Sequence, residues 1–231
     1  FRGPGVGLVA ENSGRVFVTD SIFDGLTGDG QQGTAARVGF ESTLFVRDSQ
    51  FIFNGPGAPG GTGAPVTVER STLLVRDCLF QANTSDDEGG AIFADQRSSV
   101  RVTGSTFLST PPSTTGGAIA VRDSNIRILN SHFESNSASE VGALLIESGP
   151  APSFIDRTVA IEGNTFINNS GDSLAQVSVR ASGAVFNNNL VVSTHEESSS
   201  EQTQFENNGS SDQSVAILTH NTFVGAGLFD P

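Results

Sequence analysis

A repeated alternation of apolar and polar residues runs along the chain and ends each time in a Ser-x-Phe or Asn-x-Phe triplet or a close variant. Apolar residues stand seven and five residues before the last residue of each copy, as Val16 and Val18 do before Phe23. Alternation with a period of two predicts a short strand that buries one face. The eight copies end at Phe23, Phe51, Phe80, Phe107, Phe133, Phe166, Val191 and Phe223.

Polar residues at fixed positions predict a sharp bend after each of these strands. Three residues before the end of the copy stands Asp, Asn or Gly, except for His220, and these types tolerate left-handed backbone. The next position holds Ser, Cys78 or Asn, which fits an inward-pointing side chain. An Asn also recurs three residues after the Phe, which predicts a ladder of stacked amides that satisfies buried turn groups. The ladder residues are Asn54, Asn83, Asn136 and Asn169.

A second strand lies half a repeat away, and its clearest markers are Gly-Gly-Ala-Ile at 89–92 and 116–119. Each repeat therefore reads as strand, bend, strand, bend, strand. Such a unit is too short to bury its own apolar face, so copies must stack. The sequence predicts an all-β, right-handed parallel β-helix of about eight coils, formed as a single domain over 1–231. Loops at 148–157 and 193–214 are expected to project from the rod.

Charge and composition restrict the functions that this rod can have. The net charge of −13 argues against nucleic acid as a partner, because phosphate binding needs clustered positive charge. The chain has no run of 18 apolar residues, so no membrane span is predicted. It begins with Phe1 and has no signal-type segment, which we interpret as a piece of a longer, processed protein.

The repeat also resembles known β-helical surface proteins. Phe-x-x-Asn at 51–54, 80–83, 133–136 and 166–169, together with Gly-Gly-Ala-Ile, is similar to the repeats of chlamydial polymorphic outer membrane proteins. The final stretch, 221–231, resembles the late coils of large bacterial secreted β-helix proteins. The resemblance implies a secreted or cell-surface location, whereas a shared fold does not determine a function.

Arginine pairs on neighbouring coils are the first candidates for ligand contacts. Two of the arginines stand four residues before the Phe, and the other two stand six residues before it. Both positions point outward, so each pair is able to hold an anionic glycan. Asp neighbours favour a surface ion pair instead, and those Asp residues stand at the bend position, where Gly replaces Asp in later copies. We therefore assign no catalytic residue. The residues concerned are Arg47, Arg76, Arg101, Arg127, Asp48 and Asp77.

Asp86, Asp87 and Glu88 form a compact acidic loop that is a weak candidate for Ca²⁺. The loop lacks the spaced ligands of a calcium loop, so a solvated turn is the preferred interpretation. No histidine motif predicts zinc, and no other cofactor is expected.

An apolar stripe on the outer face is the second candidate for an interaction. Phe17, Phe45 and Leu74 share the outward position on successive coils. Exposed apolar stripes mark an interface or lie under a loop. N-x-Ser/Thr triplets at Asn83 and Asn168, and a third at Asn208, matter only if the source glycosylates asparagine.

These features favour a non-enzymatic, extracellular β-helix that serves as a stalk, adhesin or assembly component. Its expected partners are other protein subunits, the rest of a larger surface protein, or glycans. The alternatives are a polysaccharide lyase or hydrolase, and a module that binds anionic glycans or Ca²⁺. The chain has no Trp or Tyr, the aromatic residues with a polar edge that suit sugar sites, and this counts against the enzyme.

Overall fold

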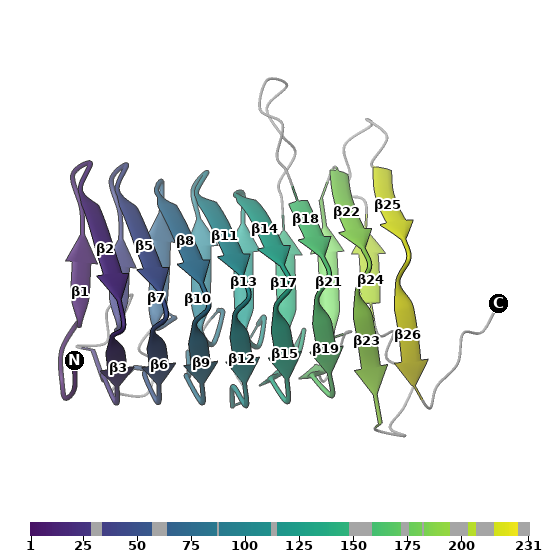
Figure 1. Ribbon diagram of the computed structural model, residues 1–231, viewed down its shortest axis with the longest axis horizontal. Coiled ribbons are helices and arrows are strands. Elements are labelled where there is room, and N and C mark those ends of the chain that lie inside the picture. Colours follow the sequence, from purple (N-terminus) through teal and green to yellow (C-terminus); the bar gives the residue numbers. More distant parts are fainter. Residues whose placement is uncertain are drawn as a thin grey trace.

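The computed structural model shows a rod in which each coil contributes one strand to each of three parallel sheets (Figure 1). The structure describes residues 1–28, 34–56, 64–86, 88–111, 115–147, 159–171, 176–181, 183–194, 203–206 and 215–225. Among these residues there is no helix long and apolar enough to cross a bilayer. The predicted fold class, an all-β parallel solenoid, is confirmed. The expected loop 148–157 and most of 193–214 lie outside the described residues.

Three sheets of eight strands run along the rod, and every pairing between neighbouring coils is parallel. The first sheet comprises β1 (Leu8–Ala10), β4 (Ala36–Val38), β7 (Val66–Glu69), β10 (Ile92–Asp95), β13 (Ile119–Arg122), β17 (Leu144–Glu147), β21 (Val177–Arg180) and β24 (Thr203–Glu206). The middle sheet comprises β2 (Arg15–Thr19), β5 (Thr43–Arg47), β8 (Thr72–Arg76), β11 (Ser99–Thr103), β14 (Asn125–Leu129), β18 (Val159–Glu162), β22 (Gly183–Asn187) and β25 (Val215–Thr219). The third sheet comprises β3 (Ile22–Asp24), β6 (Gln50–Ile52), β9 (Leu79–Gln81), β12 (Thr106–Leu108), β15 (His132–Glu134), β19 (Thr165–Ile167), β23 (Leu190–Ser193) and β26 (Thr222–Gly225). A small fourth sheet pairs β16 (Ser137–Ala138) with β20 (Ser170–Gly171).

Stacked phenylalanines form the centre of the core. From Phe23 to Phe166, successive rings are nearly parallel, with centroids 4.6 to 4.9 Å apart. These rings are at most 1% exposed and lie in the core. The predicted apolar positions of β5 to β22 are also buried, whereas Leu218 on β25 is 48% exposed because β25 is the last strand of the middle sheet.

The bend between the middle and third sheets has a left-handed residue in every coil, as predicted. The backbone φ is positive at all eight positions, including the non-glycine Asp48 at 48° and His220 at 53°. A left-handed conformation costs most residues about 1–2 kcal/mol, and Asp, Asn and Gly bear it most easily. The bend explains why these three residue types interchange along the column.

Two ladders of side-chain hydrogen bonds follow the bends; the second, formed by asparagines, was predicted, whereas for the first the sequence predicted only an inward-pointing side chain. In the first, the backbone N–H of one bend residue donates to the Ser or Asn oxygen in the next coil, from Ser21 to Ser49 and on through Ser131 to Asn164. In the second, Asn136 donates to Asn169 through Nδ2, 2.8 Å away. These bonds satisfy buried turn groups that no strand can reach.

A third ladder lies at the corner between the first and middle sheets. The N–H of Ser42 donates to the Oγ of Ser71, and the pattern continues through Ser98 to Ser124. These serines are buried. Each corner of the coil is therefore held by side chains as well as by the sheets.

The Gly-Gly motifs allow loops to fold tightly over the outer face of the first sheet. A Cβ at Gly117 would overlap the carbonyl oxygen of Gly142, and one at Gly90 would overlap that of Gly117. Under these loops, Ala120 and Leu145 are buried in a small apolar cluster outside the sheet. Around β10, β13 and β17 the first sheet is therefore covered on both faces, and side chains there are less available than those of the middle sheet.

Candidate functional site

The outer face of the middle sheet brings the predicted arginines and the predicted apolar stripe together. Strand register places one row of side chains along the rod, with the apolar residues on β2, β5 and β8 followed by arginines on β11 and β14. Two further arginines flank the row on β5 and β8. We call this set the outer row, and it consists of Phe17, Phe45, Leu74, Arg101, Arg127, Arg47 and Arg76.

The apolar part of the outer row is partly open to solvent. The rings of Phe17 and Phe45 stack with their centroids 4.6 Å apart and their planes 6° from parallel. Phe17 is 72% exposed, and Phe45 and Leu74 are half-buried. No described segment therefore covers Phe17, the most accessible aromatic ring on this face.

Arg47 and Arg76 are fixed from one side by the acidic residues that follow them. The Nε of Arg47 lies 2.8 Å from Asp48, and the Nε of Arg76 donates to Asp77 over 3.0 Å. Both arginine side chains remain more than half exposed. The predicted surface ion pairs are confirmed, and these contacts engage the Nε side of each guanidinium.

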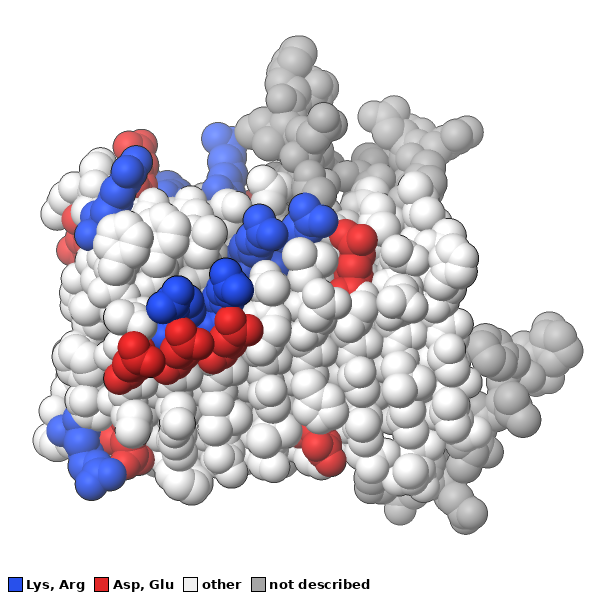
Figure 2. Space-filling view, viewed as in Figure 1, with Lys and Arg blue, Asp and Glu red and all other residues white. Residues whose placement is uncertain are grey.

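Arg101 and Arg127 continue the row on the next two coils. Arg101 is exposed, and it makes no ion pair with any described residue. Arg127 approaches Glu162 at 3.4 Å and is half exposed. Figure 2 shows basic side chains in a blue diagonal on this face, above a line of acidic side chains.

Strand register aligns the bend carboxylates Asp20, Asp48 and Asp77 on successive coils beside these arginines. Successive carboxylates are separated by about one coil, ~4.8 Å. Asp48 and Asp77 bind arginine, and Asp20 accepts a hydrogen bond from Thr19. The arrangement orients arginines and forms turns.

The predicted acidic loop is not a single cluster. Glu88 is buried and pairs with Arg122, which also lies 3.2 Å from Glu147, so the interpretation of a solvated turn is wrong for Glu88. Arg122, on the following coil, balances the charge of Glu88 on the covered side of the rod. Asp86 is exposed, and Asp87 lies outside the described residues. Within the described part of the chain, no three His, Cys, Asp or Glu residues are arranged to hold a metal ion.

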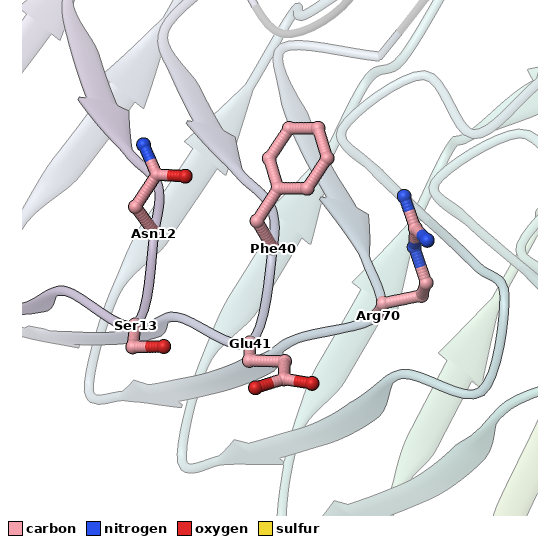
Figure 3. Close-up of a pocket in the computed structure, with 5 residues that line it drawn as sticks. All are labelled: Asn12, Ser13, Phe40, Glu41 and Arg70. Atoms are coloured by element: carbon pink, nitrogen blue, oxygen red, sulfur yellow. The ribbon is translucent and has the colours of Figure 1, made fainter.

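A shallow hollow that the sequence did not reveal lies at the corner before the middle sheet (Figure 3). Phe40 has a φ of 54°, and the guanidinium carbon of Arg70 lies 5.3 Å from its ring centroid. Asn12, Ser13 and Glu41 complete the lining. Phe is an unusual choice for left-handed backbone, so its residue type gave no turn signal.

Cys78 is a member of the bend ladder. It is 3% exposed, its N–H donates to Ser105, and its thiol contacts the carbonyl of Arg76. Burial raises the pKa of the thiol to about 11. The thiolate is the reactive form of cysteine, so the Cys78 side chain is unreactive near neutral pH.

The structure places two of the three N-x-Ser/Thr triplets. Asn83 is 1% exposed and donates to the carbonyl of Phe51, so its amide is not available in the folded chain. The Oδ1 of Asn168 accepts from the backbone N–H of Thr194. Asn208 lies outside the described residues.

Residues 1–159 match the family model described as the right handed beta helix region. The match covers more than half of the chain, and together with the parallel sheets it shows that the chain belongs to this family. The predicted right-handed β-helix is thereby confirmed. The finer resemblance to chlamydial polymorphic outer membrane proteins stays a prediction. Searches among curated proteins and among solved structures give no significant match.

Proposed function

We propose that this chain is a non-enzymatic, extracellular β-helix that acts in adhesion and contacts its ligand through the outer row. The observation that carries the proposal is the row itself. On successive coils of one continuous face, the row begins with exposed Phe17 and ends with exposed Arg101 and half-exposed Arg127. Such a combination offers apolar contact and directed charge within one surface.

The rigidity of the rod supports a role in binding. Ladders at the corners and the phenylalanine stack fix the spacing between the strands that carry the row. A surface that is already ordered loses little conformational entropy when a ligand binds. The outer row is therefore prepared to bind without rearrangement.

The adhesion proposal is tested by measuring binding and turnover on the same samples. The chain is immobilised and exposed to neutral and anionic polysaccharides, a set of extracellular matrix proteins, and vesicles with and without anionic lipid. We expect retention of at least one class without release of new chain ends from any polysaccharide. Replacing Phe17→Ser together with Arg101→Gln should abolish the retention, whereas the control Arg97→Gln, at an exposed corner position, should not.

Two results would overturn the proposal. Retention of nothing in the panel would remove adhesion through this face. Accumulation of new chain ends that is lost in Asp48→Asn or Asp77→Asn would show that the chain is a polysaccharide-active enzyme, and the bend carboxylates would then be catalytic.

A further inference from the structure

We infer that the hollow at the corner before the middle sheet is a docking site for a protein partner that presents an apolar side chain beside a carboxylate. The hollow is lined by Asn12, Ser13, Phe40, Glu41 and Arg70, which come from three successive coils (Figure 3). It shares no residue with the outer row, so this inference goes beyond the adhesive function proposed above and does not depend on it.

The backbone at Phe40 is the first observation behind this site. Phe40 has a φ of 54°, and Glu41 beside it has a φ of 63°. The same corner on the next coil has one left-handed residue, Arg70, so the turn does not need two. Gly39 adjoins Phe40 and has open space where a Cβ would stand, yet it is not the residue with a positive φ. Strained backbone of this kind is concentrated at functional sites.

The position of the Phe40 ring is the second observation. The ring is 45% exposed, whereas the phenylalanines of the central stack are at most 1% exposed. Phe40 does not belong to the buried cluster that forms the core. The core therefore does not account for a Phe at a position that disfavours Phe, and contact with another molecule does.

The partner of the ring is the third observation. The guanidinium carbon of Arg70 lies 5.3 Å from the ring centroid, within the range of a cation–π contact. Arg70 is exposed and makes no ion pair with any described residue, in a chain where acidic residues outnumber basic residues 25 to 12. The ring thus orients an arginine whose N–H groups are available to a carboxylate.

The arrangement suits a protein better than a sugar or a bilayer. Aromatic residues and arginine are the side chains most enriched at protein interfaces. A sugar would pack its C–H groups on the negative face of the ring, and Arg70 engages that face on one side. A single exposed ring is much narrower than the apolar face that inserts into a membrane surface.

The polar groups around the ring match a peptide backbone. Figure 3 shows Phe40 between Asn12 and Arg70, with Ser13 and Glu41 below. An amide and a hydroxyl both donate and accept hydrogen bonds, and a carboxylate accepts them. The partner is therefore a protein segment in which an aromatic or aliphatic residue lies beside Asp or Glu.

The test selects random heptapeptides displayed in many copies on phage, with the whole chain immobilised. Display in many copies retains weak contacts, because linked binding events reinforce one another. We expect peptides that pair Asp or Glu with an aromatic or aliphatic residue to be enriched about tenfold or more over the input library. Resynthesis of a selected peptide with an amide in place of its carboxylate should weaken its binding, because the charge-assisted hydrogen bond is lost.

Variants locate the peptides on the surface. Phe40→Asn removes the ring, Arg70→Gln removes the charge, and each should reduce retention of the selected phage about tenfold or more, as loss of an interface hot spot does. Arg97→Gln is the matched control, because Arg97 is an exposed, left-handed residue at the same corner on the following coil. This control should retain the phage as the unmodified chain does, and so should the outer-row variant Arg101→Gln with Arg127→Gln.

Urea unfolding distinguishes a binding role of Phe40 from a structural one. Phe40→Asn should leave the urea midpoint unchanged or raise it, because Asn adopts left-handed backbone more easily than Phe does. Phe107→Ala, in the central stack, should lower the midpoint clearly. If Phe40→Asn lowers it as much as Phe107→Ala does, the ring is structural and the inference is wrong.

The remaining outcomes separate the hollow from the outer row and from other ligands. Peptides without the acidic and apolar pair, or peptides retained equally by Phe40→Asn and Arg70→Gln, would overturn the docking site. If retention depends on Arg101 and Arg127 instead, the peptides support adhesion through the outer row and the hollow is not their site. Polygalacturonate and vesicles with anionic lipid are tested in parallel. If either binds, loses its binding in Phe40→Asn and no peptide is selected, the hollow does not recognise a protein.

Discussion

Asn136 offers the sharpest test of how the rod is held together. Its side chain is fully buried, and its Oδ1 accepts hydrogen bonds from the N–H and the hydroxyl of Thr110 at 3.2 and 2.8 Å. Its Nδ2 donates to the carbonyl of Phe107 and to Asn169. One amide therefore serves three coils.

Replacing Asn136→Ala leaves the N–H and the hydroxyl of Thr110 without their acceptor and removes one donor from the Phe107 carbonyl. An unsatisfied buried group costs about 1–3 kcal/mol, so the two Thr110 donors predict a loss of about 2–4 kcal/mol in the free energy of unfolding. The measurement is urea unfolding followed by circular dichroism, with the slope of the transition compared between variants.

The matched control for this substitution is Asn187→Ala. Asn187 lies on the outer face of β22, where its Oδ1 accepts from the hydroxyl of Thr219 in an exposed pair. We expect a loss under about 0.5 kcal/mol, as is usual for surface substitutions. Equal losses at Asn136 and Asn187, or a loss under about 1 kcal/mol at Asn136, would refute the structural role of the ladder.

Four further predictions concern Cys78 and the glycine motif. Cys78→Ser should keep or raise stability, because serine gives the Ser49 N–H a hydroxyl acceptor like those in the other coils; a loss above about 1 kcal/mol in urea would contradict this. With a thiol pKa raised from 9.0 to about 11, the free energy of unfolding should hold steady below pH 9 and decline between pH 9 and about 11, and the decline should be smaller in Cys78→Ser. The same thiol should react with an aromatic disulfide reagent at pH 8 only as the chain unfolds, which is read from labelling rates against urea. Gly117→Ala should destabilise by about 3 kcal/mol or more, because its Cβ would overlap a backbone carbonyl, whereas Gly183→Ala, with open space around it, should cost under about 1 kcal/mol.

The core and the bends could be predicted from sequence because stacking places like residues on like residues. Phe80, for example, pairs with Phe107, and each repeats the same offsets to its strand and bend. Eight aligned positions with the same residue types identify a turn more reliably than any single position does. The bend at Asp77 was therefore recognised as a turn even though an aligned row of carboxylates suggests catalysis.

The serine ladder at the first corner was missed although its signal is present. Ser42, Ser71, Ser98 and Ser124 each stand nine residues before the Phe of their copy. Serine is frequent throughout this chain, and the left-handed residues beside the ladder include Glu41, which carries no turn preference. The physical cause, a buried N–H that needs an acceptor, is visible only once the coils are stacked.

The burial of Glu88 could not be predicted for a different reason. The loop before each Gly-Gly motif varies in length, so no column aligns its residues. Glu88 is buried because the loop turns back over the first sheet, where Arg122 of the following coil is available. Pairing across coils in variable loops depends on the path of each loop, and a repeat pattern carries no information about that path.

The near-parallel phenylalanine rings, each in contact with one ring above and one below, make the coil a unit of length. Gain or loss of one whole repeat changes the separation of two surface features by about 4.8 Å and leaves each remaining ring with the same kind of neighbour. Evolution can therefore adjust the distance between binding groups by duplication or deletion, without redesigning the interior. The spacing between arginines on such a rod therefore changes in steps of one whole repeat.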